Sequence, residues 1–553
     1  MKDKIWLKNL LFLSLLVGGL TTMAVFLMAS NRIEPPNSFS PKSKKRVSIH
    51  NAAVNVDAAF QNQWDAVGLE NTSQADNLTI ARRLAIGLAG TIPSVEEIRK
   101  FEEQPEDAQI HWWVSRLLED PRTSDHLAER FARALVGVEN GPFLIFRRRR
   151  FVSWLADQIQ ANRKYDKIVK QILTEEGIWT DKPSVNFFTR TILQDEDETR
   201  PDPVLLAART SRAFLGMRID CLQCHDDFLG TINLGSLDEL SGGTQRDFHA
   251  LAAFFSEMEN SLLGIRDAKS KGPYQYKLLD HEKEEVIQPQ VPFNANLDGA
   301  EENLRRRLAN WITHTDNRPF ARATVNRVWA IMNGRGLIQP VDDIPLEGPF
   351  PEAIEVLVDD FVENDFDLHR LIRVIASTKA FGLQSTANFE VTDDHEKNWA
   401  VYPTIRMRPD QVAGAIAQST KLTTIDSTSH IITQLTKFGE QNDFVKRFGD
   451  PGEEEFQDRG ETVTQRLLML NGKMVAERLK NPLNTPVYIN GLSPNTEKAI
   501  ETVYLSTLTR RPNETETKHF GGQISKLHKR EKSQAMIDLY WTLINSAEFR
   551  WNH

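Results

Sequence analysis

The stretch LTIARRLAIGLAGTIPSVEEIRKFEE, residues 78–103, shows the pattern that decides the fold. Its apolar residues recur every three or four positions, which is the spacing of one face of an α-helix. Pro93 and Ser94 precede Glu97 in the arrangement of a capping box, so we expect one helix to end and another to begin there. Long alternating strand patterns are scarce elsewhere in the chain. The sequence therefore predicts a mainly α fold.

The order of segments along the chain predicts two helical lobes. At 553 residues the chain is too long for one compact core. Helical patterns occupy residues 78–260 and return over 303–553, and each stretch is predicted to form one lobe. Residues 261–302 are rich in proline, glycine and charge, which is typical of a connector. Residues 31–77 begin with Pro, Ser, Asn and Lys and have little to bury, so they are predicted to be a flexible spacer.

The first thirty residues, MKDKIWLKNLLFLSLLVGGLTTMAVFLMAS, differ from the rest in composition. Three lysines come before an uncharged run from Asn9 through Ser30. At about 1.5 Å per residue, such a run spans a hydrocarbon core of roughly 30 Å. Residues 1–30 are therefore predicted to be a transmembrane helix, with a cleaved signal peptide as the alternative. Positive charges before the run favour a cytoplasmic N-terminus, which places the bulk of a membrane-anchored chain in the periplasm or outer cell envelope.

The bulk charge of the chain excludes one class of partner. A formal net charge of -9 and a pI near 5.9 give no electrostatic reason to expect nucleic acid, which calls for a dominant basic face. No nucleophile elbow, P-loop or zincin motif occurs in the sequence. Whether the protein is an enzyme therefore stays open.

The stretch GMRIDCLQCHDDFLG, residues 216–230, contains Cys221 and Cys224, the only two cysteines of the chain, with His225 directly after them. In a c-type haem, two thiols bond to the porphyrin vinyl groups and the next histidine ligates the iron. Two cysteines and thirteen histidines placed at random give this pattern on the order of once in ten thousand such chains. The motif predicts one covalent haem c, with His225 as the proximal iron ligand.

Other roles for the cysteine pair remain as alternatives. A plain disulfide between Cys221 and Cys224 would suit an oxidising compartment. A thioredoxin-like redox pair calls for a βαβ context that the sequence lacks. A zinc site would need a fourth ligand, and the chain has no second cysteine pair.

The motif supplies only one axial ligand, so the second position of the iron is open to several candidates. His249, on the probable helix RDFHALAAFF, is a possible distal ligand, and so are Met217 and Met258. A lone histidine or methionine on an apolar helix more often packs than binds a metal. Two strong axial ligands would suit electron transfer, whereas an open position would admit small molecules or peroxide.

Several stretches resemble a known family pair. RRLAIGLAGTIPSVEEIRKFE, WVSRLLEDPRTSDHLAERFARALVG and the region around the C-x-x-C-H motif resemble the cytochrome c-like PSCyt-type domain of secreted planctomycete proteins. LANWITHTDNRPFARATVNRVWAIMNGRGLIQPVDDIPLEG and VYLSTLTRRPNETE resemble its usual partner, the planctomycete-specific PSD-type domain. The resemblance implies haem binding by Cys221, Cys224 and His225 but names no substrate. The sequence departs from the family at Asp227, where many members carry a second histidine.

A set of polar residues in the second lobe predicts either an active site or a buried network that orients helices, and the network is the favoured interpretation. The set comprises Asn317, Arg322, Asn326, Arg327, Trp329, Gly334, Arg335, Gly336, Asp342 and Asp343.

Together these observations predict an exported, membrane-anchored c-type haem protein that transfers electrons to or from a redox partner protein in the cell envelope. The alternative is an envelope structural or interaction protein in which Cys221 and Cys224 form only a disulfide. A third hypothesis is an oxidative or hydrolytic enzyme that uses the haem, with the second lobe contacting a substrate.

Overall fold

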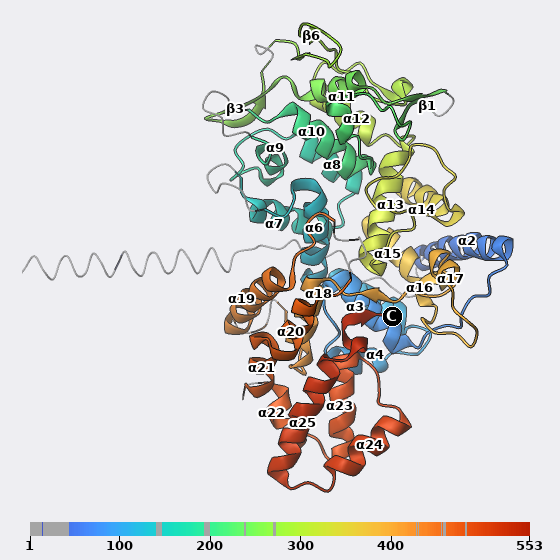
Figure 1. Cartoon of the computed structure of the whole chain (residues 1–553), viewed down its shortest axis with the longest axis vertical. Helices are drawn as coiled ribbons and strands as arrows, with labels where there is room; N and C mark the ends of the chain where they lie inside the picture. Colours follow the sequence, from blue (N-terminus) through green and yellow to red (C-terminus); the bar gives the residue numbers. More distant parts are fainter. Residues whose placement is uncertain are drawn as a thin grey trace, which may run out of the picture. The chain divides into compact units, whose positions relative to one another are not determined.

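The computed structural model of the chain describes Ser14 and residues 44–553, except 140–145, 193–199, 237–238, 269–271, 427–428, 430, 455, 457–459 and 482–483. This part is mainly helical, as the sequence predicts (Figure 1). Apart from Ser14, the predicted transmembrane segment 1–30 lies outside the described residues. Within the described part, no helix has the length and apolar composition needed to cross a bilayer. The described residues thus provide no membrane anchor, and the predicted membrane-anchored localisation is corrected on that finding.

Helix α2 (Lys44–Val67) replaces much of the predicted spacer. Its side chains Val56, Phe60 and Trp64 are fully buried, and the helix packs against α14 (Glu352–Glu363). Spacings of four residues place these side chains on one helical face. The spacer prediction rested on the Pro-, Ser-, Asn- and Lys-rich start of residues 31–77, and helix α2 begins within that stretch at Lys44.

The two helices that the opening stretch predicts are both present. Helix α3 (Asn77–Ala89) ends at Gly90, whose φ of 64° is in the left-handed region that favours glycine. Helix α4 (Val95–Glu102) begins with the predicted capping box. The Ser94 hydroxyl accepts from the amide of Glu97 at 3.0 Å, and the Glu97 carboxylate accepts from the amide of Ser94 at 2.9 Å. This local prediction is confirmed.

The remaining elements up to residue 257 are short helices around α6, with one hairpin. Helix α6 packs along α7 and against α3. Strands β1 and β2 form an antiparallel hairpin. The elements are α5 (Gln109–Glu119), α6 (Pro121–Val136), α7 (Arg148–Gln160), α8 (Tyr165–Thr174), η1 (Pro183–Val185), α9 (Asn186–Thr189), α10 (Pro203–Thr210), the π-helical turn η2 (Ser211–Leu215), η3 (Asp220–Gln223), β1 (Asn233–Ser236), β2 (Glu239–Gly242), α11 (Gln245–Ala252) and η4 (Ala253–Phe255).

The predicted connector over 261–302 folds back onto the first lobe. Ala250 of α11 is buried together with Leu278 and Ile287 in a small apolar cluster, against which Tyr274 and Tyr276 pack. Two antiparallel hairpins shape the segment, β3 with β4 and β5 with β6. Their bounds are β3 (Met258–Ser261), β4 (Gly264–Asp267), β5 (Gln275–Tyr276) and β6 (Glu285–Val286), followed by η6 (Ala295–Leu297).

The second half of the chain is helical from α12 onwards. Its central helix, α13, is buried along its length from Pro319 to Asn333. Strands β7 and β8 pair antiparallel although 145 residues separate Arg406 from Trp551. The elements are α12 (Leu304–Ile312), α13 (Arg318–Asn333), α15 (Leu368–Ala376), α16 (Lys379–Gly382), α17 (Asp393–Lys397), β7 (Ile405–Arg406), α18 (Pro409–Ser419), α19 (Ile431–Phe448), α20 (Val463–Asn471), α21 (Lys473–Lys480), α22 (Thr485–Leu492), α23 (Thr496–Leu508), α24 (Glu514–Ile524), α25 (Lys529–Ile544), α26 (Ala547–Arg550) and β8 (Trp551–Asn552).

The hydrophobic cores do not follow the two lobes that the sequence predicts. The described residues between 44 and 553 belong to one compact unit. The larger core runs from Ile49 to Tyr402 and joins side chains of both predicted lobes. The smaller core runs from Met407 to Phe549 and takes in Ile86 from helix α3. The predicted boundary therefore separates two segments of the sequence, but side chains from both segments pack in the same hydrophobic core.

Helix α3 also holds the end of the chain through two buried arginines. Arg82 donates to the carbonyl oxygens of Thr507 and Phe549, each at 3.1 Å. Arg83 donates to the carbonyl of His553 at 2.9 Å and lies over the ring of Tyr402. Buried guanidinium groups need such partners, because an unpaired buried charge is costly. Helix α3 is therefore a contact point for segments more than 400 residues away.

Candidate functional site

The cysteine pair lies on a short turn at the surface. Helix η3 carries Cys221 at its second position, and Cys224 follows at its C-terminal end. The Cys224 amide donates to the Cys221 carbonyl at 3.2 Å, which closes the turn. Both thiols are exposed and free, so the structure contains no disulfide between them. Burial and the nearby Asp227 and Asp220 raise the pKa of the Cys221 thiol, partly offset by backbone hydrogen bonds, so this thiol is protonated at neutral pH.

The carbonyl of Gln223, between the two cysteines, is the point at which the turn is held. Nε2 of His249 lies 3.1 Å from this oxygen, and Nε2 of Gln245 donates to it at 3.0 Å. The hydroxyl of Tyr276 lies 3.5 Å away. Helix α11 carries both His249 and Gln245, and a capping box between Thr244 and Asp247 fixes where that helix begins.

His249 is fully buried, and both of its ring nitrogens have partners. The Gln223 carbonyl can only accept, so Nε2 carries the proton, and Nδ1 accepts from the hydroxyl of Tyr274 at 2.9 Å. Burial lowers the pKa of His249, partly offset by the bond to Gln223, which favours this neutral form. The ring also stacks on Tyr276 with 3.5 Å between centroids. In this conformation neither nitrogen is open to a metal, and His249 acts as a support for the turn.

The two methionines named as alternative axial ligands are part of the core. Met217 is 6% exposed and Met258 is 1% exposed, and both pack in the larger hydrophobic core. The structure thus gives each of them a packing role.

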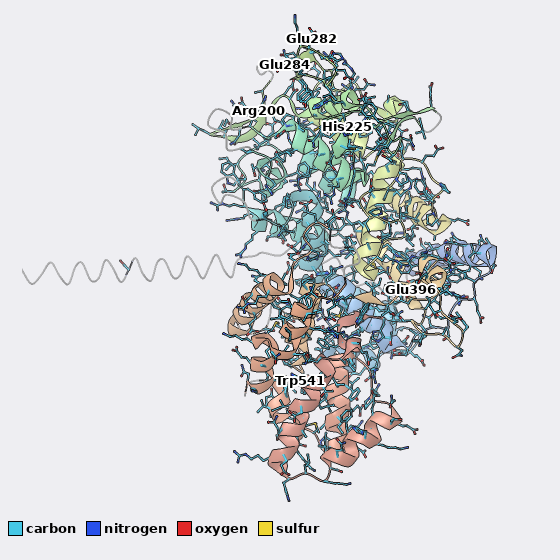
Figure 2. All side chains as sticks on the ribbon, viewed as in Figure 1. Arg200, His225, Glu282, Glu284, Glu396 and Trp541 are labelled. Carbon is cyan, nitrogen blue, oxygen red and sulfur yellow. The ribbon has the colours of Figure 1, made fainter. Side chains whose placement is uncertain are left out.

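His225 is exposed, and the arrangement of its ring differs from that of His249. Its Nδ1 lies 2.7 Å from the carbonyl oxygen of Asp226, so Nδ1 carries the proton. In a neutral imidazole this leaves the lone pair on Nε2. The ring stacks beside Phe228, which is 80% exposed, and Leu229 next to it is 87% exposed. The motif and the two residues Phe228 and Leu229 therefore present two thiols, an imidazole nitrogen and two apolar side chains to solvent. Figure 2 labels His225.

The two aspartates after His225 stabilise the loop that follows the motif. Asp226 accepts from the amide of Gln245 at 2.7 Å, which ties the motif to helix α11. Asp227 accepts from the amides of Ile232 at 2.5 Å and Leu229 at 3.1 Å. These bonds lower the pKa of Asp227. Asp227, which stands where many relatives have histidine, therefore closes a loop in this chain. Among the described residues, no group of three or more His, Cys, Asp or Glu side chains is placed to hold a metal ion.

Two family matches cover most of the chain in the order that the sequence predicts. Residues 55–260 match PSCyt2, described as a protein of unknown function (DUF1549), and residues 304–522 match PSD1, described as a protein of unknown function (DUF1553). The chain is a PSCyt2–PSD1 protein. No curated protein and no solved structure matches it. The descriptions of the two families state no activity, so the function has to be argued from the site.

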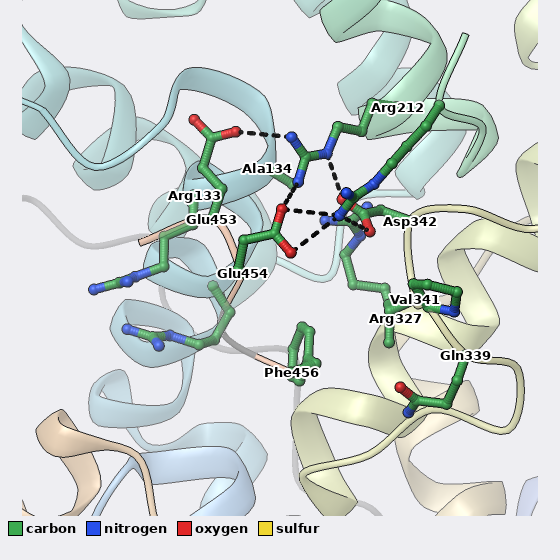
Figure 3. A pocket seen from close by; sticks show the side chains of 13 residues that line it. Arg133, Ala134, Arg212, Arg327, Gln339, Val341, Asp342, Glu453, Glu454 and Phe456 are labelled. Carbon is green, nitrogen blue, oxygen red and sulfur yellow. Dashed lines mark hydrogen bonds and ion pairs between the residues drawn. The ribbon is translucent and has the colours of Figure 1, made fainter. Parts of the chain in front are cut away.

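An ion cluster joins the PSCyt2 and PSD1 domains next to the motif (Figure 3). Arg212 and Arg218, which stands three residues before Cys221, both pair with Asp342 of the PSD1 domain. Each also donates to Glu454 at 2.9 Å. Burial would raise the pKa of Asp342, but the two guanidinium groups outweigh it and hold the pKa below its usual range. The cluster surrounds a cavity of about 30 Å³. Its arginines and carboxylates neutralise one another, so the cluster acts as a structural link between the two domains.

The polar residues singled out in the PSD1 domain mostly connect one element with another. The amide of Asn326 makes two hydrogen bonds to the backbone of Ile338, at 2.9 and 3.0 Å. Arg322 pairs with Glu355 of helix α14 at 2.7 Å. The amide of Asn317 donates to the carbonyl of Trp311 at 2.9 Å. These contacts fit the network interpretation rather than an active site.

Sequence reasoning missed the residues that support the motif from outside it. Gln245, Tyr274 and Tyr276 all contact the Gln223 carbonyl or His249. The two tyrosines alternate with Gln275 at the start of strand β5. Alternation of this kind is typical of a strand whose aromatic side chains share one face. This alternation was the one sequence pattern that could have indicated the two tyrosines. It was not used because the segment was assigned as a connector.

Proposed function

We propose that the PSCyt2 domain carries one covalently attached haem c, which Cys221 and Cys224 would bond and His225 would ligate through the iron, and that the protein transfers electrons. The observation that carries this proposal is the hydrogen bond from Nδ1 of His225 to the carbonyl of Asp226 at 2.7 Å. Histidine ligands commonly donate their second ring N–H to a carbonyl or carboxylate, which fixes the tautomer and orients the ring. This bond leaves Nε2 of His225 as the nitrogen that can bind iron.

The residues around the motif fit attachment of the cofactor. Both thiols are free and exposed, so a porphyrin can approach each of them. Phe228 and Leu229 offer apolar surface beside His225. The turn itself is anchored from behind through the Gln223 carbonyl, which His249 and Gln245 hold. A bound haem would supply an iron that alternates between the ferrous and ferric states and so carries one electron.

The residues of this chain would then fix the cofactor and its proximal side. Cys221 and Cys224 would hold the porphyrin by two thioether bonds, and His225 would bind the iron through Nε2. His249 would not bind iron in this arrangement, because both of its nitrogens bond to protein groups. Its part is to keep the turn in place. The redox partner would be a second protein that reaches this exposed surface.

The test is co-expression of the chain with a cytochrome c maturation system, followed by a pyridine haemochrome spectrum and intact-mass measurement. We expect the added mass of one haem on the purified chain. The double variant Cys221→Ser, Cys224→Ser should lose the covalent haem while keeping its fold, because both side chains are exposed. The control His281→Gln changes another partly exposed histidine and should keep the haem.

Two results would contradict the proposal. The mature chain could carry no added porphyrin mass although a known c-type cytochrome matures in the same cells. Alternatively, its mass could show the two sulfurs linked to each other, which would favour an interaction protein with a plain disulfide.

A further inference from the structure

A second cavity, of about 500 Å³, lies in the PSD1 half of the molecule and shares no residue with the C-x-x-C-H motif. Its volume falls within the range of small-molecule sites, roughly 300 to 1,000 Å³. Glu396 on its border and His225 stand well apart in Figure 2. The cavity is therefore a separate candidate site, and nothing argued for it depends on the haem.

The wall of this cavity is assembled from segments far apart in sequence. The end of helix α13 and strand β7 form one part, and the start of α18 continues it. The end of α19, the start of α20 and strand β8 supply the rest. The pairing of β7 with β8 brings Trp551 and Asn552 into the wall. The cavity exists only when residues 331–552 are folded together.

The described lining residues are more positive than the chain as a whole. They include the four arginines Arg335, Arg406, Arg408 and Arg447, and only two acidic side chains. Three of these arginines also pair with acidic side chains outside the lining: Arg406 with Glu461 at 3.5 Å, Arg408 with Asp410 at 3.9 Å and Arg447 with Asp443 at 2.9 Å. These acids neutralise part of the positive charge, while the lining itself holds two more arginines than acidic side chains. A concave site lined by one sign of charge attracts ligands of the opposite sign. The smaller cavity of the ion cluster shares Gln339 and Phe456 with this wall and is itself lined by five arginines and three acidic residues.

Two of these arginines lie against aromatic rings. Arg406 lies over Phe448 at 5.9 Å from the ring centroid, and Arg408 lies over Phe456 at 5.8 Å. A guanidinium near an aromatic ring is attracted to it by a cation–π interaction, and its fork of N–H donors matches the geometry of a carboxylate. The charge excess therefore comes from groups whose orientation is restrained.

Uncharged hydrogen-bonding groups form the other large class of lining side chains. A ligand that reached them would be recognised through its hydroxyl or other polar groups. They are Asn333, Gln339, Thr404, Gln411, Thr462, Thr464, Gln465 and Asn552. Phe448, Phe456 and Trp551 add aromatic surface for the less polar faces of such a ligand. A wall of this composition suits neither a purely apolar molecule nor a bare inorganic ion.

We propose that this cavity binds a small, hydroxyl-bearing carboxylate, of the size and polarity of a monosaccharide acid. The arginines would bind the carboxylate, and the amide and hydroxyl side chains would bind the hydroxyl groups. Glu396 and Asp450 remain in the wall, so a singly charged carboxylate is favoured over a doubly charged phosphate.

The test is calorimetric titration of the full chain with three probes. Glucuronate has both the carboxylate and the hydroxyl groups, glucose lacks the charge, and cyclohexanecarboxylate lacks the hydroxyl groups. We expect saturable binding of glucuronate with a Kd at least tenfold lower than that of either other probe. Glucose 6-phosphate is a fourth probe, and tighter binding of it than of glucuronate would overturn the choice of a carboxylate.

Two variants locate the binding in the cavity without disturbing the core. Arg447→Gln removes an exposed charge that pairs with Asp443 on its own helix, and Thr404→Trp fills the cavity from an exposed position. Each should raise the Kd for glucuronate at least tenfold. The matched controls Arg306→Gln and Thr515→Trp change exposed residues outside the lining and should leave it unchanged. Absence of saturable glucuronate binding, or binding that both cavity variants leave unchanged, would overturn the proposal.

Discussion

Replacing His249 with phenylalanine should loosen the C-x-x-C-H turn without emptying the space beneath it. The phenyl ring keeps the stacking position on Tyr276, where the imidazole lies at 3.5 Å. It loses the bond to the Gln223 carbonyl at 3.1 Å and the bond from Tyr274 at 2.9 Å. Each such bond contributes about 1 kcal/mol net, so opening of the turn should become easier by about 2 kcal/mol. This corresponds to a change of about thirtyfold in the opening equilibrium.

Native-state hydrogen exchange followed by mass spectrometry measures this change directly. The amide of Cys224, which donates within the turn at 3.2 Å, should exchange about thirtyfold faster in His249→Phe than in the unmodified chain. His249→Gln keeps a side-chain donor and should recover part of the protection. His281→Phe, at a partly exposed position, is the control and should have no effect. Unchanged exchange of Cys224 in His249→Phe would refute the idea that this imidazole holds the turn.

Three further predictions concern stability. Burial lowers the pKa of His369 from 6.5 to about 4. Between these pH values only the unfolded chain takes up the proton, so the free energy of unfolding falls as the pH falls. In urea unfolding from pH 6.5 to 4, the free energy of unfolding of His369→Gln should fall by about 3 kcal/mol less than that of the unmodified chain. Asp342→Asn removes the carboxylate shared by two arginines of the ion cluster and should lower the free energy of unfolding by about 2 kcal/mol, whereas Asp359→Asn, at a 57% exposed site, should cost less than about 0.5 kcal/mol. Gly87→Ala places a Cβ 2.6 Å from a carbonyl oxygen of helix α13. It should lower the free energy of unfolding by at least about 2 kcal/mol, and Tm with it. The control Gly522→Ala, with nothing within 4 Å of the added carbon, should leave Tm unchanged or raise it.

The parts of the fold that follow local rules could be predicted from the sequence. The capping box of Ser94 and Glu97 depends on residues three apart, and the structure forms it as predicted. The mainly helical character likewise follows from the spacing of apolar residues. Helix α2 was missed because only three or four strongly apolar side chains mark its buried face. The apolar packing between the two predicted lobes could not be predicted, because it is tertiary and leaves no periodic signal.

In the candidate site too, the local motif could be predicted from the sequence and the long-range contacts could not. Cys221, Cys224 and His225 form a contiguous motif, and the sequence was sufficient to single them out. The support behind them is not contiguous, since Tyr274 lies 25 residues from the histidine that it contacts. The ion pair between Arg212 and Asp342 spans 130 residues. The wall of the large cavity combines residues from 331 to 552. Separations of this size are set by the complete fold, so single-sequence patterns do not indicate them.

The contacts of Arg83 set a limit on when the molecule can finish folding as it is made. This residue lies early in the chain, on helix α3, yet one of its hydrogen bonds goes to residue 553, which is 470 positions later. At about 5 to 20 residues per second, translation of that interval takes roughly half a minute to a minute and a half. Throughout that time Nε of Arg83 lacks its acceptor, although the carbonyls of Phe381 and Leu383 become available earlier. Ile86 likewise lacks part of its packing until residues up to Phe549 are made. Helix α3 can therefore complete its native contacts only after residue 553 has been made.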